Sequence, residues 1–175
     1  VSFGDMGQYQ KGSEYFVYEA DEFDRNFLAF EPYISAITGV SWDHHEIFPT
    51  RSSYQDAFRE FIEQSRYTIL WQEDLEYLRL EPSPSVLAQS STTRAIDTIQ
   101  LKGLYNRLDA WLAVQAVHKA TGTPVEDLLK HINAFPGLQR RMEQIMPNLF
   151  SDYAHTPEKI RGAMSVALEM AAEKN

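Results

Sequence analysis

Two short apolar runs near the start of the chain each end in a cluster of polar side chains. The first covers residues 15–18 and is followed by acidic residues at 19–24, and the second covers residues 33–40 and is followed by a polar segment at 42–46. Short β-rich runs that end in turn-forming residues are typical of buried strands. We therefore predict strands near 15–19 and 33–39, and, if the two are parallel, both polar clusters emerge at one edge of the sheet.

A helix and a further strand follow these two runs. Residues 53–66 place Tyr54, Phe58, Phe61 and Ile62 on one face of a 3.6-residue period, which predicts an amphipathic helix with Ser52 or Ser53 as its N-cap. Residues 67–71 predict a strand. Strand, helix, strand is the unit of a parallel sheet, so the fold class is α/β. The link at 23–32 is short for a parallel crossover, and we expect a single helical turn at 25–30.

Turn-forming and linker residues at 82–85 and 89–93 mark a change of composition. We predict one domain over residues 1–80, a linker at 81–102 and a second domain over 103–175. Within the later part we expect a strand at 95–101, a helix at about 107–121 that ends at Gly122, and a helix that starts at a capping box at 123–126. A strand ending at 151–153 then leads into a last helix, capped by Thr156, from Pro157 to about Ala172.

Composition limits the classes of function. The 175 residues include no cysteine, which excludes disulfides and thiolate sites. The net charge of −9 argues against a broad basic face for nucleic acid. The sequence shows no apolar run of the ~20 residues that span a bilayer and no signal peptide, so we expect a cytoplasmic protein. The first residues resemble the middle of a longer chain.

Carboxylates and a histidine follow the first two predicted strands. Glu19 stands among acidic residues, and His44 lies between Asp43 and His45. Open α/β sheets bind ligands beyond the carboxyl ends of their strands, and oxygen and imidazole ligands suit a divalent cation. The alternatives are a solvated acidic loop and an exposed histidine pair. An Asp-His-His metal motif of a phosphoesterase is a further reading of 43–45.

Two later segments have candidate chemistry of another kind. Arg140 and Arg141 follow Gly137, and paired arginines on such a loop can clamp a phosphate, although a solvated surface pair has the same sequence. Asp152 and His155 lie where a strand end feeds a helix N-terminus, a place that attracts anions and positions ribose hydroxyls. Ordinary helix capping is the alternative there.

The order of these motifs resembles that of the Mur ligase family, the ATP-dependent amide ligases that build the peptide of the bacterial cell wall. The resemblance covers nearly the whole chain except residues 72–95. It is carried by 19–24, by 37–39 with Asp43 and His44, by Gly103 with Asn106, by 135–137 with the arginine pair, and by 152–157. It implies part of a central, mostly parallel-sheet ATP-binding domain followed by the first part of a Rossmann-like C-terminal domain.

The resemblance also implies roles for individual residues. Glu19 and His44 match positions that hold Mg²⁺, Asn106 matches an asparagine near the adenine, and Arg141 matches an arginine that reaches the ATP phosphates. Asp152 matches a ribose-binding aspartate, and His155 lies near the incoming amino acid. The implied cofactors are ATP and Mg²⁺, and the implied partners are a UDP-N-acetylmuramoyl substrate and an amino acid or peptide.

The chain departs from the family pattern in several places. Gly39 and Asp109 stand where asparagines are usual, and the phosphate-binding loop, the N-terminal domain and most of the C-terminal domain are absent from these 175 residues. We therefore expect a fragment that is inactive alone.

The branch of the family is open to more than one interpretation. The lack of lysine in 53–66 favours the branch that adds L-alanine or the one that recycles a murein tripeptide, whereas 152–157 favours the diamino-acid-adding branch. We favour L-alanine. A folylpolyglutamate-type ligase and a protein that binds nucleotide without catalysis remain alternatives.

Overall fold

Three parallel strands organise the first half of the protein. The structure, a computed structural model, describes residues 11–136, 141–155 and 157–172. The strands are β1 (Ile34–Ile37), β2 (Tyr67–Trp71) and β3 (Val86–Gln89), in that spatial order. Ile34 pairs with Tyr67, and Thr68 pairs with Val86. The predicted α/β class and parallel sheet are confirmed, and β3 arises in a segment that we had expected to be linker.

Helix α1 (Arg51–Gln64) connects β1 to β2, as the apolar period predicts. Its N-cap is Thr50, not Ser52 or Ser53. The Thr50 hydroxyl accepts from the Ser53 backbone N–H at 3.1 Å, and the Ser53 hydroxyl accepts from the Thr50 backbone N–H at 3.3 Å. The predicted cap was wrong because this reciprocal pair of hydrogen bonds satisfies the backbone N–H groups of Thr50 and Ser53. The helix therefore begins earlier than the sequence predicted.

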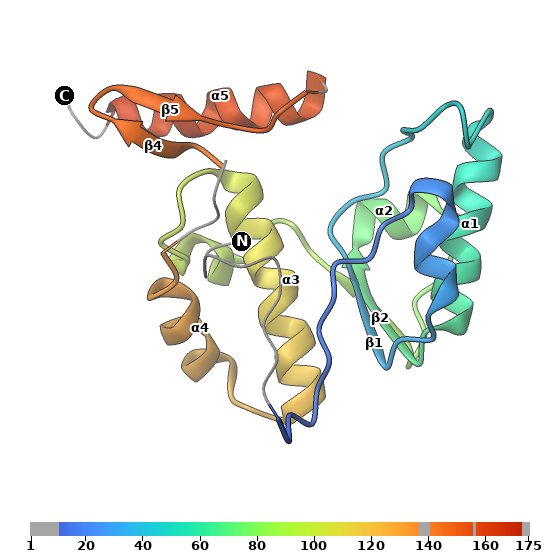
Figure 1. The fold of residues 1–175 in the computed structure, drawn as a ribbon. Coiled ribbons are helices and arrows are strands. Elements are labelled where there is room, and N and C mark those ends of the chain that lie inside the picture. Colours follow the sequence, from blue (N-terminus) through green and yellow to red (C-terminus); the bar gives the residue numbers. More distant parts are fainter. Residues whose placement is uncertain (1–10, 137–140, 156, 173–175) are drawn as a thin grey trace.

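The sheet is covered on both faces because side chains alternate along each strand. Leu70 points into one cluster with Ile37, α1 and the short helix α2 (Gln72–Tyr77), whereas Ile69 and Trp71 point into a second cluster on the opposite face. Figure 1 shows α1 on one side of β1 and β2 and α3 on the other. Burial of β2 on both faces explains its continuous apolar run.

The second cluster joins the sheet to α3 (Leu104–Thr121) through Trp111, Leu112 and Val114. Gly122, with a φ of 71°, ends this helix as predicted. Residues 94–98 form a 3-10 helix, η2 (Arg94–Thr98), so the strand predicted at 95–101 is wrong. Its apolar side chain Ile96 is buried by packing in the second cluster instead of by strand pairing. The domain division stays a prediction, and residues on both sides of 81–102 share this cluster.

Three further elements complete the later part. Helix α4 (Val125–Asn133) packs on α3 and begins after Pro124, which is the N-cap, so the predicted Thr123 capping box is wrong. The Thr123 N–H is held by the Thr121 hydroxyl at 3.1 Å, which draws residue 123 into the preceding turn. Strands β4 (Glu143–Met146) and β5 (Leu149–Ser151) form an antiparallel hairpin, and α5 (Pro157–Ala172) follows. The cap predicted at Thr156 lies outside the described residues.

The first predicted strand is wrong. Residues 15–18 form no strand and pair with no described strand, and Phe16 and Val17 are 83% and 89% exposed. The Tyr15 hydroxyl donates to the Ala120 carbonyl at 3.1 Å. Phe16 stacks on Tyr18, and Tyr18 lies against Phe30 with ring centroids 4.5 Å apart. Apolar character alone does not make a strand, because a strand also needs a partner for its backbone groups. The helical turn expected at 25–30 is present as η1 (Phe23–Ala29).

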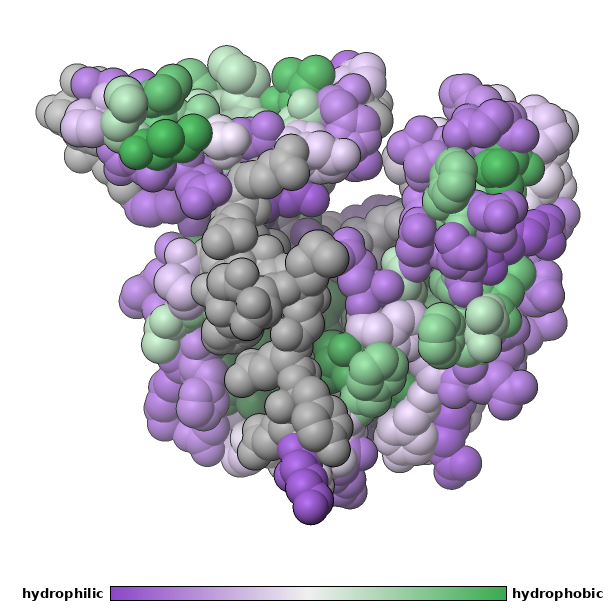
Figure 2. All heavy atoms as spheres, viewed as in Figure 1, coloured by the Kyte–Doolittle hydropathy of each residue, from purple (hydrophilic) through white to green (hydrophobic). Residues whose placement is uncertain are grey.

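Apolar side chains are also exposed at the other end of the chain. Ile145 and Met146 on β4 and Leu149 on β5 are each about half exposed, and Figure 2 shows apolar atoms on this part of the surface. No helix within the described residues has the length and apolarity to cross a membrane.

Helix α5 is anchored on the start of α3 by close approach at two glycines. A Cβ added at Gly103 would overlap Val166, and one added at Gly162 would lie 3.1 Å from the Tyr105 ring. Gly103 also has a φ of 84°, which side-chain-bearing residues rarely adopt. The lack of a Cβ at these positions is therefore what allows the two helices to meet.

We expect Gly103→Ala to destabilise the protein by about 1–3 kcal/mol, because it adds both backbone strain and the overlap with Val166. Chemical denaturation followed by circular dichroism measures the change. Gly39→Ala is the matched control, since Gly39 has no atom within 4 Å of its Cβ position and no left-handed φ. Equal stabilities of the two variants would contradict the proposed packing.

Candidate functional site

His44 lies in the turn after β1, where the carboxyl end of the strand brings it to the sheet edge. Its backbone is left-handed, with a φ of 53°, and its N–H donates to Asp43 Oδ1 at 2.8 Å. The ring is held between two carboxylates: Nε2 is 3.5 Å from Glu22 Oε1, and Nδ1 is 3.9 Å from Glu46 Oε1. The Phe23 ring packs edge-on against it. The histidine therefore faces an acidic environment, as the sequence indicates.

Glu22, not Glu19, is the residue of the acidic segment that meets His44. Glu19 is exposed, and no hydrogen bond or ion pair joins it to another residue in the part of the chain that the structure describes. Within that part, no three His, Cys, Asp or Glu side chains are grouped to hold a metal ion. The pairing of Glu19 with His44 around one ion stays a prediction. The position of Glu19 follows from the unpaired run before it, which leaves residue 19 outside the sheet.

Asn106 and Asp109 lie on one face of α3, three residues apart. The Asn106 amide donates to the Lys102 carbonyl at 2.7 Å, which fixes its orientation at the start of the helix. The surrounding protein raises the pKa of Asp109 to about 6 through desolvation, although the residue remains accessible, and the positive charge of Arg141 opposes this rise. The structure thus brings Arg141 within electrostatic range of the face that contains Asn106.

Asp152 organises the turn that joins the hairpin to α5. Its Oδ2 accepts from the Met142 N–H at 2.9 Å, and its Oδ1 accepts from the Ala154 N–H at 2.7 Å. Both oxygens therefore accept from backbone N–H groups. One of these donors, Met142, is next to Arg141 in the sequence. In this arrangement Asp152 fixes the position of the backbone that presents Arg141.

His155 follows in the same turn. Its Nδ1 is 2.8 Å from the Tyr153 carbonyl, a contact that places a proton on Nδ1. Lys159 Nζ lies 3.5 Å from Nε2 of the same ring. Arg140 and Gly137 lie outside the described residues.

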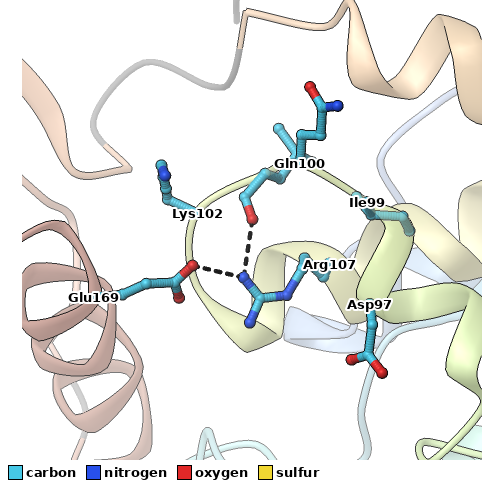
Figure 3. A pocket seen from close by; sticks show the side chains of 7 residues that line it. Asp97, Ile99, Gln100, Lys102, Arg107 and Glu169 are labelled. Atoms are coloured by element: carbon cyan, nitrogen blue, oxygen red, sulfur yellow. Dashed lines mark hydrogen bonds and ion pairs between the residues drawn. The ribbon is translucent and has the colours of Figure 1, made fainter. Parts of the chain in front are cut away.

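A pocket of about 520 Å³ lies beside the start of α3 and was not anticipated from the sequence. Arg107 forms an ion pair of 2.8 Å with Glu169 of α5 and donates to the Leu101 carbonyl at 3.1 Å, as Figure 3 shows. The other Glu169 oxygen accepts from the Gly103 N–H at 3.1 Å. Desolvation raises the pKa of Glu169, but the Arg107 and Gly103 hydrogen bonds outweigh it and lower the pKa. Only the packing of α5 on α3 creates this site, so its residues are far apart in sequence.

Comparison with known proteins finds similarity to Mur ligases, in agreement with the motifs. The chain is 28% identical to the UDP-N-acetylmuramate–L-alanine ligase of Lactobacillus delbrueckii subsp. bulgaricus, over 93% of this chain and 44% of that protein. It is 29% identical to the protein of the same name from Christiangramia forsetii, over 94% of this chain and 42% of that protein. The resemblance to the Mur ligases is confirmed.

The fold agrees with that of a solved Mur ligase. UDP-N-acetylmuramate-alanine ligase MurC from Thermotoga maritima superposes with a TM-score of 0.65 and 22% identity, over 87% of this chain and 42% of that one. No protein-family model matches the chain. The chain spans less than half the length of the Mur ligases that it matches.

We expect stability to depend on pH through Asp109. Because its folded-state pKa, about 6, lies above the ordinary 3.8, the folded protein binds the extra proton, and stability falls as pH rises from about 4 through 6. Asp109→Asn should remove this part of the pH dependence and raise stability at neutral pH. Thermal unfolding midpoints measured across this range, with Asp97→Asn as the control, check the effect. An unchanged pH profile in Asp109→Asn would contradict it.

Proposed function

We propose that this chain is part of an ATP-dependent ligase that joins a carboxylate of a UDP-N-acetylmuramoyl substrate to an amino acid, L-alanine, in peptidoglycan biosynthesis. The observation that supports this most directly is similarity to proteins named UDP-N-acetylmuramate–L-alanine ligase over 93% of the chain. The placement of His44 at a strand end and of Arg141 near α3 is consistent with it. A cytoplasmic location accompanies the proposal, because ATP and the nucleotide-sugar substrate are used there.

The donors near His44 suit Mg²⁺ in kind. Mg²⁺ in phosphate-transferring enzymes takes one or two protein ligands and completes its shell with water and phosphate oxygens. Glu19 and His44 would hold the ion, with Asp43 fixing the backbone of His44 through the 2.8 Å hydrogen bond. When bound, the ion supplies positive charge against the phosphates of ATP.

The chain's own residues would then do the remaining work. Asn106 would orient the adenine and Asp152 the ribose, while Arg141 would face the phosphates and stabilise charge as the carboxylate becomes an acyl phosphate. His155 would lie beside the incoming amine. In the described structure Arg141 already lies close enough to α3 for its charge to affect Asp109. Asp152 accepts from the N–H of Met142, next to Arg141, and from that of Ala154, next to His155, which supports a shared role for the two segments.

The experiment uses the full-length protein, with the parts that precede and follow these residues. We expect phosphate release that requires ATP, Mg²⁺, UDP-N-acetylmuramate and L-alanine together. We expect Glu19→Ala and His44→Ala each to lower turnover by about 10²-fold or more, because each removes charge stabilisation of the phosphates. Normal ADP release by Glu19→Ala would refute the metal assignment.

Two controls make this test specific. Glu31→Ala changes an exposed carboxylate away from His44 and should leave turnover unchanged. Glu22→Ala removes the carboxylate that contacts His44, so a loss confined to this variant would assign the metal to Glu22 in place of Glu19. Hydrolysis of a phosphodiester without ATP or amino acid would instead favour a phosphoesterase, and transfer of glutamate to a folate would favour the folylpolyglutamate-type ligase.

A further inference from the structure

Three arginines converge on a second pocket, which lies on the α1 side of the sheet. The pocket has a volume of about 560 Å³ and is lined by residues from the start of α1 and from the end of α2: Arg51, Ser52, Gln55, Arg59, Tyr77 and Arg79. In a chain of net charge −9, this local concentration of positive charge is unusual. No residue that we assign to the ligase reaction lines it.

The frame of the pocket is held by hydrogen bonds between the two helices. The Gln55 amide donates to the Tyr77 carbonyl at 2.8 Å, and the Arg59 Nε donates to the Leu78 carbonyl at 2.8 Å. These bonds satisfy the last carbonyl groups of α2 and hold the end of α2 against α1. The wall that contains the arginines is therefore an ordered surface.

The charges in the pocket are only partly balanced. Arg59 forms an ion pair of 2.6 Å with Asp56, which leaves Arg51 and Arg79. Arg51 packs over the Trp42 ring at 5.3 Å, and neither residue forms an ion pair with any carboxylate in the described ranges. Arg51 and Arg79 are both exposed, and an anion with two negative charges would balance the two positive charges that line this one cavity.

The backbone at Arg79 also indicates a role for this side chain. Arg79 follows α2 in the left-handed conformation, with a φ of 54°, and the Leu80 N–H donates back to the Leu75 carbonyl at 3.1 Å. This is the C-terminal capping position that glycine usually fills, because a side chain there costs stability. An arginine at this position places a guanidinium in the pocket despite that cost.

We propose that this pocket binds a phosphate dianion, either inorganic phosphate or the phosphate of a small monoester. Guanidinium groups bind phosphate with paired N–H donors, and the Ser52 hydroxyl, which also lines the pocket at the start of α1, donates to Asp56 Oδ2 at 3.4 Å. A phosphate monoester, with a second pKa of about 6, carries close to two negative charges at neutral pH, whereas a simple carboxylate carries one.

The test is a titration of the chain with inorganic phosphate, and separately with glycerol phosphate, followed by amide NMR shifts of residues 51–59 and 77–80. For glycerol phosphate we expect saturable binding that weakens as pH falls through about 6, where the monoester dianion takes up a proton. For inorganic phosphate the same weakening should begin at a higher pH, because its second pKa is higher. Arg79→Gln should weaken it by about tenfold or more. Arg94→Gln is the matched control, since this exposed arginine lies outside the pocket. The affinity of this variant for phosphate should be unchanged. Tighter binding of one phosphate source identifies the ligand.

Arg79→Gly separates a loss of binding from a loss of fold. Glycine suits the left-handed backbone, so this variant should unfold at a higher temperature and yet bind phosphate as weakly as Arg79→Gln. The proposal is overturned if phosphate does not saturate, if acetate binds equally well, or if Arg79→Gln and Arg94→Gln behave alike. These outcomes concern only this pocket and leave the ligase proposal unaffected.

Discussion

The burial of β2 on both of its faces is the constraint on which the rest of the structure depends. Leu70 faces α1 and α2, and its neighbours Ile69 and Trp71 face α3. A strand with apolar side chains in both directions must be covered on both sides, because each exposed side chain of this size would lose roughly 1.5–3 kcal/mol of burial free energy. Helices on both faces are the arrangement that parallel sheets use to provide this cover.

That cover also determines where functional groups lie. Once α1 is on one face and α3 on the other, the turn after β1 opens at the carboxyl edge of the sheet, and His44 lies in it. The start of α3 presents Asn106 and Asp109, and Arg141, which precedes the Met142 N–H that donates to Asp152, lies within electrostatic range of Asp109. The polar sites thus occur at the ends of elements whose positions are set by apolar packing.

Some of the backbone conformations that cost stability lie at these ends. His44 and Arg79 are left-handed, and Gly103 has a positive φ where α5 approaches α3. At Gly103 the conformation serves packing, because a Cβ would overlap Val166. At His44 and Arg79 a charged or titratable side chain stands where glycine or asparagine would be less strained.

The sequence by itself determined the elements whose signal is local. The apolar period of α1, the β-rich run of β2 and the glycine that ends α3 each predicted the observed element, because helix periodicity and helix ends depend on neighbouring residues. The order of motifs also predicted the resemblance to the Mur ligases. Only the tertiary structure decided that residues 15–18 pair with no described strand, that 94–98 form a 3-10 helix and that 86–89 join the sheet. It likewise decided that Glu22 contacts His44, and that Arg51 and Arg79 share one pocket. These outcomes depend on partners distant in the sequence, and local propensity contains no information about which distant groups will meet.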